Sequence, residues 1–119
     1  MASSILETKI EQFAITLKKK HKYPSYVSGA EYNYCKIVAM SGDIDKTEFV
    51  KSLIIELSKF GNIGEKYKGS SIGFCAETIS ANKVLQRFPL NIDVLNVGRA
   101  IRPRTMQVGK RCKICKTIF

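Results

Sequence analysis

The sequence predicts an α/β (α+β) fold in which helices flank a small mixed sheet. Two observations lead to this prediction. Residues 4–20, 46–60 and 75–88 carry apolar side chains at helical spacing, whereas residues 31–40 and 92–101 are short runs rich in strand formers. Helices and strands that alternate in this order usually pack as helices against a sheet.

The first predicted helix spans residues 4–20. Its apolar stripe consists of Leu6, Ile10, Phe13 and Leu17, and Ser3 or Ser4 can cap its first turn. Four lysines crowd its C-terminal end: Lys18, Lys19, Lys20 and Lys22. The helix dipole favours cations at that end, so this explanation stands beside a contact with nucleic acid.

The second and third predicted helices have clear start and stop signals. Asp45 and Glu48 form a capping-box pattern before residues 46–60, and Pro89 ends residues 75–88. The helix over 75–88 is apolar around much of its girth, which predicts that it is buried. Glycine-rich residues 61–69 between the two helices predict a loop.

Length and charge narrow the function classes. The 119 residues fit one domain, spanning 1–119, and no run of 18 apolar residues could cross a membrane. The formal net charge is +10, and residues 99–119 contain basic side chains but no acidic one. Such an excess attracts polyanions, of which nucleic acid is the commonest. An acidic protein partner, or solubility alone, would account for the charge as well.

The four cysteines are Cys35, Cys75, Cys112 and Cys115. A Cys-x-x-Cys pair alone is compatible with a structural zinc site, a redox dithiol or chance. A structural zinc site needs four protein ligands, whereas a catalytic one has three and leaves a fourth position for water. Cys35 falls within a predicted strand, which leaves three candidate ligands. His21, the only histidine, follows the lysine run and is more typical of a solvated helix end.

The tripeptide Cys75-Ala76-Glu77 begins the third predicted helix. The positive end of a helix favours a thiolate at Cys75. Glu77 falls in the same first turn, close enough to serve as a proton carrier without being a ligand. Taken alone, a glutamate at a helix start is better explained by the helix dipole.

Together these residues resemble the zinc-dependent cytidine deaminase superfamily, and most of all the bacterial polymorphic-toxin deaminases of the YwqJ-like group. The superfamily pattern is His or Cys, any residue, Glu, then Pro-Cys-x-x-Cys. The resemblance lies in three segments: Gly73-Phe74-Cys75-Ala76-Glu77, Arg102-Pro103-Arg104-Thr105 and Arg111-Cys112-Lys113-Ile114-Cys115. It implies a compact three-layer fold, a zinc cofactor on Cys75, Cys112 and Cys115, and Glu77 as catalytic acid and base.

The sequence departs from the family pattern beside the metal ligands. Arg111 stands where proline is usual, and the first ligand is a cysteine rather than a histidine. Three thiolates make the site more negative, and Arg111 or Arg104 could offset that charge. As substrate-binding residues we expect Arg102, Arg104, Arg111, Tyr32 and Tyr34, with Tyr23 and Tyr26 as further candidates for stacking a base. At least one of these tyrosines is expected to face the core instead.

The resemblance implies a hydrolase that converts cytosine to uracil in DNA or RNA, used as a secreted or delivered interbacterial toxin effector. Such a domain would act in the cytoplasm of a target cell and pair with an acidic immunity protein. Two alternatives remain at this point. One is a deaminase of free nucleosides or nucleotides, and the other is a zinc-containing module that binds nucleic acid without catalysis.

Overall fold

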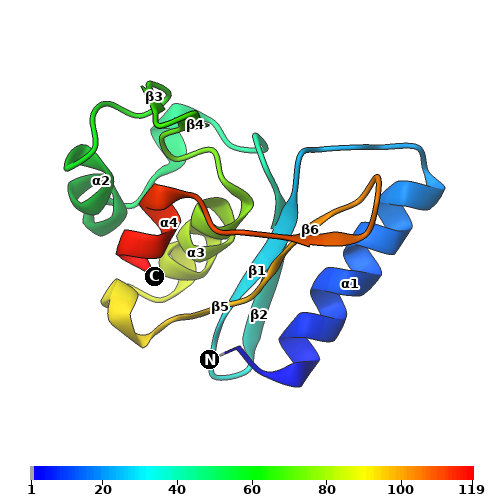
Figure 1. Cartoon of the computed structure of the whole chain (residues 1–119). Coiled ribbons are helices and arrows are strands. Elements are labelled where there is room, and N and C mark those ends of the chain that lie inside the picture. Colours follow the sequence, from blue (N-terminus) through cyan, green and yellow to red (C-terminus); the bar gives the residue numbers. More distant parts are fainter. Residues whose placement is uncertain (1) are drawn as a thin grey trace.

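The computed structural model describes residues 2–119 and contains four α-helices and seven short strands in that range (Figure 1). In chain order the elements are α1 (Ser4–Lys19), β1 (Val27–Tyr32), β2 (Cys35–Met40), the 3₁₀ turn η1 (Lys46–Glu48), α2 (Lys51–Ser58), β3 (Lys66–Tyr67), β4 (Ser70–Ser71), α3 (Ala76–Arg87), the 3₁₀ turn η2 (Ile92–Val94), β5 (Asn96–Val97), β6 (Ala100–Arg102), β7 (Gln107–Gly109) and α4 (Lys113–Ile118).

The main sheet is a central layer between helices. Its strand order is β2-β1-β6-β7, with β5 also paired to β1, and β3 and β4 form a separate two-stranded ribbon. Helix α1 covers one face of the sheet, and α3 lies on the opposite side with α2 and α4 beyond it (Figure 1). This arrangement confirms the predicted α+β class with flanking helices.

The sheet differs from the prediction in one respect: the pairings within residues 2–119 are all antiparallel, so the sheet is not mixed. The connections explain this. Tyr32 pairs with Cys35 across a two-residue turn, and Arg102 pairs with Gln107 across another short turn. Turns of this length join only antiparallel strands, because parallel strands need a crossover of a dozen or more residues.

Strand β1 is the centre of the fold, and its residues alternate between the two helical layers. On one side, Gly29 lies so close to α1 that an added Cβ would be 2.9 Å from a Leu6 methyl and 3.1 Å from Ile10. On the other side, Ala30 joins the larger core cluster, together with Leu53 of α2 and Val84 of α3. The glycine therefore lets α1 approach the strand closely enough to bury its apolar stripe.

Helix α1 confirms the prediction for residues 4–20. Ser3 is its N-cap and accepts a hydrogen bond from the backbone N–H of Leu6 at 3.2 Å. Glu31 in β1 holds the same serine, accepting from its backbone N–H at 2.6 Å and from its hydroxyl at 2.7 Å. The capping box of Asp45 and Glu48 is present, as predicted, but it begins η1 rather than a continuous helix.

Two predicted strands are wrong in extent. Residues 31–40 are not one strand but the end of β1, a turn at Asn33 and Tyr34, and β2. Asn33 adopts a positive φ of 53°, a conformation that asparagine tolerates better than most residues. Residues 92–101 divide similarly into η2, β5 and part of β6.

The helices within residues 2–119 include none with the length and hydropathy of a membrane span, as the sequence predicted.

Candidate metal centre

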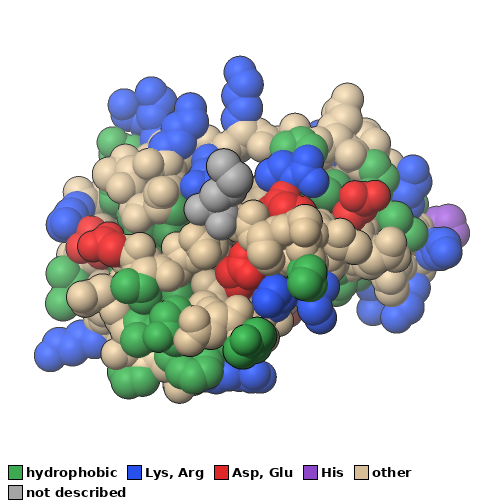
Figure 2. Space-filling model, turned by 90° about the horizontal axis from the view of Figure 1, so that it is seen from below, with side chains coloured by type: hydrophobic (Ala, Val, Ile, Leu, Met, Phe, Trp, Pro, Cys, Tyr) green, Lys and Arg blue, Asp and Glu red, His purple; other side chains and the backbone are tan. Residues whose placement is uncertain are grey.

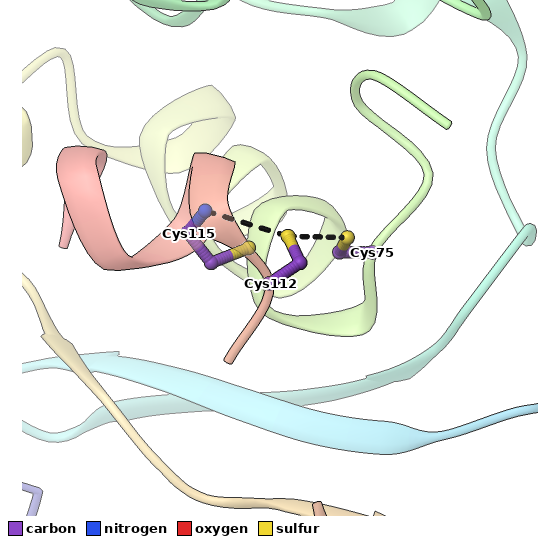
Figure 3. A group of neighbouring side chains, drawn as sticks. All are labelled: Cys75, Cys112 and Cys115. Carbon is purple, nitrogen blue, oxygen red and sulfur yellow. Dashed lines mark hydrogen bonds between the residues drawn. The ribbon is translucent and has the colours of Figure 1, made fainter. Parts of the chain in front are cut away.

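Two helices that are distant in sequence begin at the same place. Cys75 is the N-cap residue of α3, and Cys112 is the N-cap residue of α4. Cys115 follows in the first turn of α4, where its side chain is fully buried. Figure 3 shows the three sulfur-bearing side chains side by side between the two helix starts. The neighbouring Ile114 belongs to the main core and anchors α4 against it.

The three sulfur atoms are spaced as a metal ion would require. The Sγ atoms of Cys75 and Cys112 are 3.3 Å apart, and all three Sγ atoms lie within 4.8 Å of one another. Sulfurs at about 2.3 Å from a tetrahedral zinc are roughly 3.8 Å apart, so these residues fit three of its corners. Cys35 lies in β2, packed against the main core, and is not part of this cluster.

Hydrogen bonds within the cluster decide which sulfur is ionised. The thiols of Cys115 and Cys75 donate to Cys112 and hold the pKa of that thiol well below its usual range. The backbone N–H of Cys115 adds a further donor, at 3.5 Å from Cys112 Sγ. The same bonds, together with burial, raise the pKa values of Cys75 and Cys115. The shifts therefore make Cys112 the thiol of the three that loses its proton most readily.

Glu77 lies in the first turn of α3 and is only 4% exposed. Burial raises the pKa of its carboxyl group, and the nearby Cys112 thiolate adds to this shift, while Arg111 opposes it. Such a shift suits a group that must both accept and donate a proton near neutral pH. The serine that follows one turn later, Ser80, donates to the backbone carbonyl of Glu77 at 2.9 Å and holds this turn.

An open cavity of about 770 Å³ connects the cysteines and Glu77 to solvent. Cys75, Cys112 and Glu77 form part of its wall. The remaining wall comes from the connection before β1, the residues after β2, the β3–β4 ribbon, the start of α3 and the C-terminal segment. These residues are Tyr23, Pro24, Ser25, Tyr26, Ser41, Gly42, Lys66, Gly69, Ser70, Ser71, Phe74, Ala76, Ala100 and Lys110. The cavity thus combines a thiol cluster, a buried carboxyl group, two tyrosines and two lysines.

The three predicted arginines lie beside this cavity and are not part of its wall. Arg111 adjoins the metal cluster, and its guanidinium donates to the carbonyl of Val97 at 2.7 Å. Arg102 and Arg104 are exposed and lie over the rings of Tyr26 and Tyr23, which line the cavity.

Two of the predicted substrate-binding residues are not brought to the cavity. Tyr34 is at the tip of the β1–β2 turn and is 97% exposed. Tyr32 packs against the core, with its ring 5.6 Å from that of Phe88. The cavity lies at the other end of these strands, beside Ser41 and Gly42, which follow β2.

Lys66, Ser70 and Ser71 line the cavity but were not among the predicted site residues. They belong to the β3–β4 ribbon, inside a segment predicted only as a glycine-rich loop.

No protein-family model, curated protein or solved structure matches this chain. The candidate site therefore depends on its own geometry: three cysteines close enough to hold a metal ion, and a buried glutamate beside them.

Proposed function

We propose that this protein is a zinc-dependent nucleobase deaminase that converts cytosine to uracil in nucleic acid. The observation that carries the proposal is the grouping of Cys75, Cys112 and Cys115 beside the buried carboxyl group of Glu77. Two of these cysteines, Cys75 and Cys112, line one open cavity together with Glu77. Three ligands leave a fourth position free, which a purely structural zinc site does not have.

The proposed reaction consumes one water and releases one ammonia. Zinc, when bound, would supply a Lewis acid that makes water nucleophilic at neutral pH. Glu77 accepts a proton from the water, delivers it to the ring nitrogen next to the attacked carbon, and returns a proton to the departing amine. Its raised pKa suits these transfers, because a strongly acidic carboxyl group would not hold the proton between them.

Surrounding charge favours a polyanionic substrate. Lys66 and Lys110 line the cavity, and Arg102 and Arg104 flank it. A neutral nucleoside would leave these cations without a counter-charge, whereas a phosphate backbone would neutralise them. The free-nucleoside alternative is less well supported for this reason.

As a biological role we propose a bacterial toxin effector, delivered to the cytoplasm of a target cell and neutralised by an acidic immunity protein. The motif resemblance supports this role, and the net charge of +10 suits an acidic partner. Figure 2 shows that Lys and Arg side chains outnumber Asp and Glu on the face that it draws.

The test compares Glu77→Gln with Glu11→Gln, a matched change at an exposed position of α1. Ammonia release and C-to-U conversion are measured on DNA, RNA and free nucleosides with zinc-loaded protein. We expect Glu77→Gln to lower the rate about 10²- to 10⁴-fold without loss of zinc, and Glu11→Gln to leave it unchanged. Full activity in Glu77→Gln would refute the mechanism. Zinc and nucleic-acid binding with no ammonia from any substrate would instead establish the non-catalytic module.

A further inference from the structure

Two tyrosine–arginine pairs lie beside the cavity along the β1–β6 pairing: Tyr26 with Arg102, and Tyr23 with Arg104. We call these four residues the track. Val27 in β1 pairs with Ile101 in β6, so the next residues, Tyr26 and Arg102, are neighbours across the strands. The Arg102 guanidinium lies 5.2 Å from the centre of the Tyr26 ring and donates to its hydroxyl at 3.3 Å. Beyond the paired ends of β1 and β6, the Arg104 guanidinium lies 4.5 Å from the centre of the Tyr23 ring.

The inner ring of this track is fixed by close packing on the backbone. A Cβ added to Gly109 in β7 would overlap the Tyr26 ring, so only glycine leaves room for this ring. Ser41 accepts a hydrogen bond from the backbone N–H of Tyr26 at 3.2 Å and fixes the same residue from the other side. The outer ring, Tyr23, is 38% exposed and therefore accessible to a ligand.

The cations along this track have no carboxylate partners. Within residues 2–119 the ion pairs involve Lys36, Lys59 and Arg99, and no acidic side chain is paired with Arg102 or Arg104. The cavity wall likewise carries two lysines, Lys66 and Lys110, and Glu77 as its acidic residue. Guanidinium groups that stack on rings keep their N–H donors available for phosphate. The track therefore offers flat stacking surfaces and unpaired positive charge side by side.

We propose that this track, made of Tyr23, Tyr26, Arg102 and Arg104, binds the nucleotides that flank the target base in a single-stranded nucleic acid. The proposal rests on the proposed function, because it takes the cavity at Cys75 and Glu77 as the place where the target base reacts. Stacking on tyrosine or arginine needs a base whose face is free, which a strand provides and a paired duplex does not. Arg102 and Arg104 then contact the phosphates between stacked bases.

The binding test uses ligands that cannot react. Thymine has no exocyclic amine, so an oligothymidylate reports binding to the track without turnover. Fluorescence anisotropy with zinc-loaded protein compares a labelled five-nucleotide oligothymidylate with thymidine monophosphate as its competitor. We expect the oligonucleotide to bind the native protein at least tenfold more tightly, since a single nucleotide cannot place its base beside Glu77 and also stack a base on the track.

Two variants and two matched controls locate the contact. Tyr23→Leu removes the partly exposed ring of the track, and Tyr34→Leu removes a more exposed ring in the turn at the far end of β1. Arg104→Gln removes a track cation, and Lys51→Gln removes an exposed cation at the start of α2. We expect Tyr23→Leu to weaken oligonucleotide binding about 5- to 150-fold, the range for loss of one stacked base. Arg104→Gln should also reduce the slope of log K against log salt by about 0.7.

The controls decide the outcome. Unchanged binding in both Tyr23→Leu and Arg104→Gln would overturn the proposal, as would equal losses in Tyr34→Leu or Lys51→Gln. Failure to bind any oligonucleotide, with tight binding of an acidic peptide, would overturn it in favour of a protein partner. If the track binds oligonucleotides as expected but cytosine oligonucleotides release no ammonia, the deaminase function alone is refuted.

Discussion

Zinc binding should release about two protons per ion in a metal-free Glu77→Gln protein near pH 6. We expect Cys112 to be a thiolate in the free cluster, because hydrogen bonds from Cys115 and Cys75 lower the pKa of its thiol. Cys75 and Cys115 keep their protons because their pKa values are raised. All three must be deprotonated to hold zinc, so two protons leave. The Glu77→Gln background removes the one nearby carboxyl group whose own proton would complicate the count.

The number of protons released separates a preformed cluster from three independent thiols. Independent thiols with an ordinary pKa of about 8.5 would all be protonated near pH 6 and would release about three protons. Isothermal titration calorimetry, in buffers of equal pH but different ionisation enthalpy, measures this number directly. Cys35→Ser is the matched control and should leave both the stoichiometry and the proton count unchanged, since Cys35 is outside the cluster. Release of about three protons would refute a hydrogen-bonded cluster with a deprotonated Cys112, and the absence of zinc binding would refute the site.

Two predictions concern stability. Ser3→Ala should lower the free energy of unfolding by about 0.5–2 kcal/mol because it removes the cap of α1 and a partner of Glu31, whereas Ser4→Ala, one residue into the helix, should have little effect; urea denaturation of both variants checks this, and equal losses would contradict the cap's role. The raised pKa of Glu77 means that the metal-free folded state binds more protons than the unfolded state above the reference pKa of 4.5. Its stability relative to Glu77→Gln should therefore fall as pH rises from 4.5 through the folded-state pKa, and parallel pH profiles for the two proteins would exclude a buried, proton-binding Glu77.

The sequence predicted the helices and the cysteine site better than the strands. Helix α1 was recognisable because its apolar residues repeat at helical spacing over 16 residues and Ser3 caps it. Residues 31–40 were predicted as one strand because they are rich in strand formers and contain no glycine or proline that would indicate a turn. The reversal at Asn33 depends on one positive φ angle, and the register follows from packing against both helical layers.

The cysteines could be grouped in advance because their residue types and spacing carry the chemistry. Which tyrosines reach the cavity could be decided only from the three-dimensional fold. Tyr23 and Tyr26 reach the cavity while Tyr32 and Tyr34 do not, since the latter two lie at the opposite end of β1. Lys66 and Ser70 belong to a ribbon of two-residue strands, too short to leave a periodic pattern in the sequence. Lys66 and Ser70 reach the cavity through packing between segments distant in sequence, which a short stretch of sequence does not reveal.

The position of Cys112 as the N-cap residue of α4 links metal binding to the stability of the C-terminal segment. Helix α4 has six residues, fewer than an isolated helix needs to be stable in water, so it depends on Ile114 and on the cysteines for its place. A metal shared by Cys75 and Cys112 would close a loop between residues 37 positions apart and fasten the C-terminal segment to the core. Metal supply would then set both the activity of the protein and its resistance to proteases. A chelator would then expose α4 to proteases before the rest of the protein.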